Sequence, residues 1–229
     1  MTKEKEFKID PSWKGVIKWG GFSLFAAGFV LVLFILSVFI LQPDLPLDAE
    51  EVLEDPLAPT YLFLLAAIGE LFLLPAALGL YFALKDFNKT NMFMATALWV
   101  VAVPVFLASR GLIISLALIS GDYKDASTET EKVAYLASAE HAIETQSVLS
   151  AMGLILLSVA FIIIGFVMLK GVFGKRIGYL VIVSGIFSIF APFAVYLEIP
   201  DIISFSGLIL SIFWELVVGV KLYKMGKEV

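Results

Sequence analysis

Long apolar runs, separated by short polar segments, dominate the sequence. Crossing the roughly 30 Å hydrocarbon layer of a bilayer takes about 20 mostly apolar residues in a helix. Six runs reach that length, at residues 16–41, 60–84, 92–119, 148–169, 177–197 and 202–223. The pattern predicts an all-α polytopic membrane protein, in which six transmembrane helices form a single domain over residues 1–229.

The two longest connections between these runs differ in pattern. Residues 42–59 hold four prolines and six acids, which predicts an extended or turn-rich connection with no fold of its own. Residues 120–147 instead contain Thr128 and Glu131 at the spacing of a capping box, followed by apolar positions at helical spacing. We therefore expect an amphipathic helix over about 128–147, either lying at the outer interface or extending the fourth span outward.

Composition supports a membrane protein and excludes several kinds of chemistry. The chain is 60% hydrophobic and 16% charged, with a mean hydropathy of +0.97, whereas soluble domains are about 25% charged. It has no cysteine, and His141 is its single histidine. Disulfides, thiolate metal sites and multi-histidine centres are thereby excluded. We expect no cofactor and no nucleic-acid partner. The first apolar run is too long for a signal peptide and is expected to be retained.

Charge predicts the orientation of the bundle. Basic residues gather in alternate connections, and most of the 21 acids fall in the others. By the positive-inside rule, both termini should lie in the cytoplasm, in a multi-pass protein of the cell (cytoplasmic) membrane. Thirteen of the sixteen basic residues belong to the inner set: Lys3, Lys5, Lys8, Lys14, Lys18, Lys85, Lys89, Lys170, Lys175, Arg176, Lys221, Lys224 and Lys227.

Three ionisable residues lie well inside the predicted spans: Glu70, Arg110 and Glu215. Facing lipid in the charged form, each would cost roughly 2.5–3.5 kcal/mol, so they should face protein. Glu70 and Arg110 each lie roughly 14 Å from the outer end of their helix, and Glu215 roughly 20 Å. Because a short turn joins the second and third spans, we expect an ion pair between Glu70 and Arg110. Arg110 could also bridge to Glu215.

Small residues surround the acids. Glu215 belongs to the series Gly207, Ser211, Glu215 and Gly219, and small residues at that spacing let helices approach closely. Glu70, Arg110, Glu215 and Ser211 are therefore the predicted buried polar or ligand-binding centre. Three interpretations stay open: a structural pair that fixes helix packing, a ligand or substrate site, and a proton relay in which two acids compete for one base.

A second polar cluster lies in the 120–147 connection. Glu140, His141 and Glu144 fall within one helical turn of each other, and carboxylates with an imidazole could bind a divalent metal. The alternative is an ordinary solvated helix face, which the lack of further histidines favours.

Three stretches together resemble a known family: GELFLLPAALGLYFAL at 69–84, FIIIGFVMLKGVFGKRIGYLVIVSG at 161–185, and WELVVGVKLY at 214–223. They are similar to the prokaryotic membrane family called domain of unknown function 4386, over about residues 15–225. The resemblance implies six helices and assigns family positions to Glu70, Arg110, the basic turn at 175–178, and Glu215. This chain departs from the pattern at Gly174, where a proline is expected, and at Gly171, where a small polar residue is usual.

These observations favour a non-enzymatic membrane protein: a carrier, a binder of a small or lipophilic ligand, or a structural component. Its expected partners are the lipid bilayer and a lipid or small-molecule ligand, and a homo-oligomer stays open. The alternatives are a lipid-modifying enzyme that uses Glu70 or Glu215 as acid or base, and a proton or cation carrier.

Overall fold

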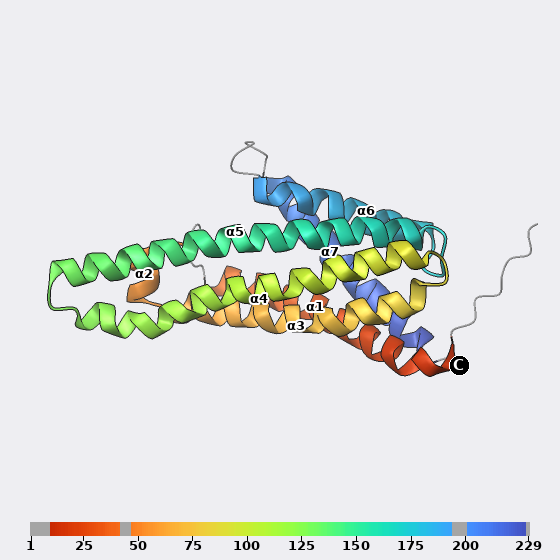
Figure 1. The fold of residues 1–229 in the computed structure, drawn as a ribbon, viewed down its shortest axis with the longest axis horizontal. Coiled ribbons are helices and arrows are strands. Elements are labelled where there is room, and N and C mark those ends of the chain that lie inside the picture. The colour runs from red at the N-terminus through yellow and green to blue at the C-terminus, as the bar shows by residue number, and fades with distance from the viewer. Residues whose placement is uncertain (1–9, 42–46, 194–200, 228–229) are drawn as a thin grey trace, which may run out of the picture.

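A computed structural model describes residues 10–41, 47–193 and 201–227, and all regular elements of these residues are helical. In chain order they are η1 (Pro11–Trp13), α1 (Lys14–Leu41), α2 (Ala49–Glu54), α3 (Leu57–Leu84), α4 (Lys89–Asp125), α5 (Glu129–Met168), α6 (Lys175–Phe190), η2 (Ala191–Phe193) and α7 (Asp201–Met225). Figure 1 shows them as a bundle of long helices, with α4 and α5 the longest.

Six helices are long and apolar enough to cross a membrane: α1 with η1, α3, α4, α5, α6 with η2, and α7. Large apolar side chains cover their outer surface, among them Phe39 at 67% exposure and Leu118 at 80%. Such a surface is stable in lipid and unstable in water. The predicted all-α, six-helix architecture is thereby confirmed, and the chain is a multi-pass membrane protein.

The six spans form a closed ring. Packing runs from α1 to α3, α4, α5, α6 and α7, and α7 returns to pack along α1. Short turns between α3 and α4 and between α5 and α6 make these pairs antiparallel neighbours. The ring places α4 and α7 on opposite sides of the bundle centre. α1 begins and α7 ends at the same end of the bundle (Figure 1), here called the terminal end.

Glycines hold neighbouring helices close together. A Cβ added to Gly79 of α3 would lie 2.7 Å from the Cα of Gly20 on α1. On α7, a Cβ at Gly219 would lie 2.6 Å from the backbone nitrogen of Phe25. Larger side chains would force these helices apart. Small residues thus allow close backbone contact, and the resulting van der Waals packing is one source of helix association in lipid.

Three aromatic side chains fill the centre of the helix bundle toward the terminal end. Trp99, Phe161 and Trp214 come from α4, α5 and α7 and meet edge to face, with ring centroids 4.7–6.1 Å apart. Both tryptophans are fully buried. Rings in this geometry attract each other beyond their burial, so the aromatic triad joins opposite sides of the bundle.

At the end of the bundle opposite the terminal end, α4 and α5 continue past the other spans (Figure 1). At 1.5 Å per residue, α4 and α5 are about 55 and 60 Å long, well over the roughly 30 Å hydrocarbon thickness. Thr128 and Glu131 form the predicted capping box at the start of α5. The predicted amphipathic helix is therefore the N-terminal part of one continuous helix with the fourth span, and this continuity is the second of the two arrangements expected from the sequence.

The expectation that residues 42–59 have no fold of their own is wrong for the described part. Asp48 caps α2 through hydrogen bonds from the backbone of Glu50 and Glu51. Val52 and Leu53 of α2 are buried in a small core between α4 and α5. The apolar contacts with the extended α4–α5 hairpin, absent from any local pattern, stabilise this short helix.

At the other end, Gly174 precedes α6 with φ +84°. Proline cannot adopt a positive φ, whereas glycine does so at little cost. This backbone conformation explains why the chain has glycine at a position where the family pattern led us to expect proline. α6 ends at Phe190 and η2 at Phe193, and the predicted continuation of the fifth helix over 194–197 lies outside the described residues.

Candidate functional site

The predicted ion pair between α3 and α4 is present. Arg110 donates two hydrogen bonds to Glu70 Oε1, from Nε at 2.9 Å and from Nη2 at 2.8 Å. The two side chains are only 18% and 11% exposed. The attraction between the two charges offsets part of the cost of burying each of them. Glu70 Oε2 is buried and has no hydrogen-bond partner among the described residues.

α5 completes the surroundings of Arg110. Arg110 Nη1 donates to Ser150 Oγ at 3.2 Å, and Gln146 Nε2 donates to the same oxygen at 2.9 Å. Ser109 Oγ lies 3.0 Å from Ser150 Oγ and donates to the carbonyl of Phe106. Since both lone pairs of Ser150 Oγ are then used, its own proton points to Ser109. The guanidinium also lies 5.5 and 5.6 Å from the ring centres of Phe63 and Phe106, within cation–π range.

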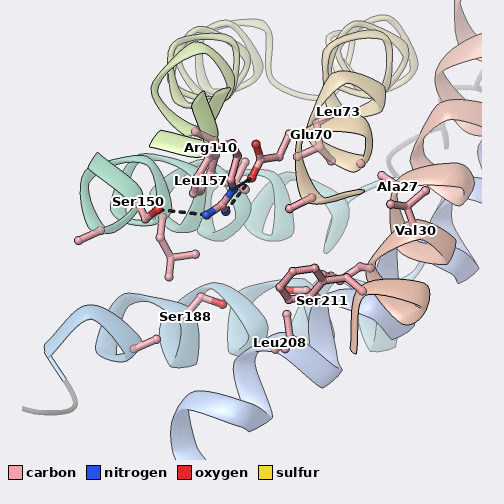
Figure 2. Close-up of a pocket in the computed structure, with 18 of the residues that line it drawn as sticks. Ala27, Val30, Glu70, Leu73, Arg110, Ser150, Leu157, Ser188, Leu208 and Ser211 are labelled. Carbon is pink, nitrogen blue, oxygen red and sulfur yellow. Dashed lines mark hydrogen bonds and ion pairs between the residues drawn. The ribbon is translucent and has the colours of Figure 1, made fainter. Parts of the chain in front are cut away.

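The ion pair borders a cavity of about 610 Å³, which all six spans line. Such a volume is typical of pockets that hold a small organic ligand. Most of the lining is apolar, from residues such as Val30, Leu73 and Leu157. In Figure 2, Glu70, Arg110 and Ser150 lie on one side of this space, and Ser188, Leu208 and Ser211 on the other.

The aromatic triad bounds the cavity toward the terminal end. Phe161 is one of the lining residues. Trp99 lies about three helical turns, or roughly 16 Å, nearer the terminal end than Arg110 on α4. At the other edge of the cavity, Ser147 is exposed. The cavity therefore has a packed aromatic floor toward the terminal end, and its lining includes an exposed side chain at the opposite edge.

Glu215 and Ser211 also line the cavity, from α7. Ser211 Oγ lies 2.8 Å from Ser184 Oγ of α6. Glu215 is only 5% exposed, yet no hydrogen bond or ion pair joins it to any described residue. The expected bridge from Arg110 to Glu215 is absent, because Arg110 is engaged by Glu70 and Ser150 from its own side of the ring. The cavity thus brings all four predicted residues together around one space without bonding them into one network.

The candidate metal cluster is not assembled. Glu140, His141 and Glu144 are exposed on the N-terminal part of α5. In the portion of the chain that the structure describes, no three His, Cys, Asp or Glu side chains are grouped so as to hold a metal ion. A solvated helix face, the alternative interpretation of this cluster, agrees with that exposure.

Ser150 and Gln146 contact the Arg110 side of the site, and sequence analysis missed both. Serine and glutamine are common at helix ends, and the fourth span was predicted to begin at residue 148, which placed both near an interface. A continuous α5 instead carries them beside Arg110. Their spacing of one helical turn, on a helix that also carries buried Ser158, was the available signal.

Comparison with known proteins gives a family and no described activity. Neither a curated protein nor a solved structure matches the chain. Residues 23–226 match the family described as Domain of unknown function (DUF4386). The match covers nearly the whole chain, including Glu70, Arg110 and Glu215. The chain therefore belongs to the DUF4386 family.

Proposed function

We propose that this protein binds a small, largely apolar ligand in the cavity between its six spans, as a carrier or a ligand-binding membrane protein. One observation carries the proposal: a mostly apolar cavity of about 610 Å³ has on its walls an ion pair and an acid, Glu215, that no described residue pairs with. An apolar space with a few convergent polar groups is the usual form of a ligand site.

The geometry argues against a purely structural role for these charges. A pair that only fixes helix packing needs a filled interior, and the apolar lining around Glu70 and Arg110 instead leaves space. A structural role also gives no reason for Glu215, which stabilises no described neighbour through a hydrogen bond or ion pair. Buried polar groups without partners are costly, and a ligand that satisfies them would offset that cost.

The test is saturable binding of a neutral apolar probe to the protein in nanodiscs, measured by calorimetry with n-decanol. Ala151→Phe adds a ring inside the cavity, whereas Ala134→Phe adds the same ring at an exposed position of the same helix. We expect the first variant to weaken decanol binding at least tenfold and the second to leave it within about twofold of wild type. Equal binding by both variants, or no saturable binding to wild type, would overturn the proposal.

A further inference from the structure

We propose that the ligand of this cavity is a lipophilic amine, an apolar body with a cationic nitrogen, and that Glu215 is its counter-ion. This inference rests on the proposed function, since it names the chemical class that the same cavity would accept. It depends on three features: the isolation of Glu215, the neutralisation of Arg110, and the apolar walls.

Glu215 is isolated although buried. Only 5% of the residue is exposed, and in the described part of the chain neither a hydrogen-bond donor nor a cation pairs with it. A Cβ added to Gly28 of α1 would lie 3.1 Å from Glu215 Cβ, so α1 packs directly against the base of this side chain. The carboxyl group is thus held at the cavity wall with its own bonding capacity unused.

Arg110 cannot balance Glu215. Its Nε and Nη2 bond to Glu70, and its Nη1 bonds to Ser150. Among the described lining residues, the charged ones are Glu70, Arg110 and Glu215. With the first two paired, an ionised Glu215 leaves one excess negative charge. A ligand cation completes the balance, whereas a carboxylate or phosphate ligand would add a second uncompensated charge in a medium of low dielectric constant.

The remaining walls specify the rest of the ligand. Leu208, Leu154 and Ala27 contribute apolar surface, and the floor is the aromatic ring of Phe161. Ser211, one turn before Glu215, has its hydroxyl engaged with Ser184. An alkyl or aromatic body fits these walls, and its amine end would approach Glu215 as a charge-assisted hydrogen-bond donor.

Three probes with the same chain test this inference: decylamine, decanol and decanoate, each titrated into the protein in nanodiscs at pH 7. We expect wild type to bind decylamine at least tenfold more tightly than decanoate. Glu215→Gln, which keeps the shape and removes the charge, should weaken decylamine binding tenfold or more and leave decanol within about twofold. Glu144→Gln removes an exposed acid of α5 and should change neither.

The amine assignment would be overturned if wild type bound decylamine and decanoate with comparable affinity, or if Glu215→Gln bound decylamine as tightly as wild type. Decanol binding to wild type would then still support the proposed function. If wild type bound none of the three probes, the proposed function would be overturned as well. If Glu215→Gln does not fold, the relative affinities of wild type for the three probes still test the amine assignment. Nanodiscs of phosphatidylglycerol with and without phosphatidylethanolamine distinguish two sources of the amine. If phosphatidylethanolamine competes with decylamine, the ligand is a lipid headgroup. If it does not compete, the ligand is a free amine.

Discussion

Removing one partner of the Glu70–Arg110 pair should destabilise the bundle far more than removing both. Each side chain is at least four-fifths buried, and two hydrogen bonds join them. Glu70→Gln leaves the guanidinium charge buried without a counter-charge, and Arg110→Met does the same to the carboxylate. Breaking a buried pair in this way costs about 3–5 kcal/mol.

The double variant Glu70→Gln/Arg110→Met leaves no buried charge at this site. Its cost should therefore fall well below the roughly 6–10 kcal/mol that two independent losses would give, which corresponds to a coupling energy of about 3 kcal/mol or more. Ordinary hydrogen bonds between membrane helices average about 0.6 kcal/mol. The size of the coupling thus distinguishes an ion pair from a polar contact.

Equilibrium unfolding in mixed micelles, followed by helical circular dichroism, measures all four corners of this cycle. Ser150→Ala is the neutral control, because it removes the hydrogen bonds of Ser150 Oγ with Arg110, Gln146 and Ser109 without removing a charge. At about 0.6 kcal/mol for each bond, it should cost about 2 kcal/mol. The exchanged variant Glu70→Arg/Arg110→Glu should recover much of the stability lost by either single exchange. Additive single losses, with no recovery on exchange, would refute the reasoning.

Three further predictions concern packing, capping and orientation. Gly79→Ala places a Cβ 2.7 Å from a backbone atom of α1 and should lower stability by about 1–3 kcal/mol. Gly111→Ala is the control, because a Cβ there has no atom within 4 Å, and it should not lower stability. Equal melting temperatures of the two variants would contradict the close packing at Gly79. Thr128→Ala removes the cap of α5 and should speed hydrogen exchange in its first turn, at a cost of about 1 kcal/mol; unchanged exchange would argue against the cap. Because the chain has no cysteine, the variants Glu140→Cys and Lys170→Cys each carry a single thiol that reports the orientation. A membrane-impermeant maleimide should label Glu140→Cys in intact cells and Lys170→Cys only after permeabilisation. The reverse labelling would contradict the predicted topology.

The ion pair between Glu70 and Arg110 shows how much can be predicted from the depth of a residue along its helix. Both residues were expected at the same level on helices joined by a short turn, and neighbouring antiparallel helices must then bring them close. The same depth argument failed for Glu215. Depth does not specify the direction in which a side chain points or the position of its helix in the ring, and α7 lies opposite α4.

The sequence by itself determined the six spans and the all-α class. Transfer of an apolar run into lipid depends on that run alone, and a spanning backbone must satisfy its own hydrogen bonds, so each helix is specified locally. Helix ends were less well determined: α2, and the joining of the amphipathic segment to the fourth span, depend on contacts with other helices.

Only the tertiary structure decided the cavity, its aromatic floor and the isolation of Glu215. These features arise from which faces of six helices meet, and glycines such as Gly20 and Gly79 set how closely they meet. Ser150 joins the site for the same reason, because its place beside Arg110 depends on how α4 and α5 are packed. A space between helices belongs to no single segment, and hence no local pattern encodes it.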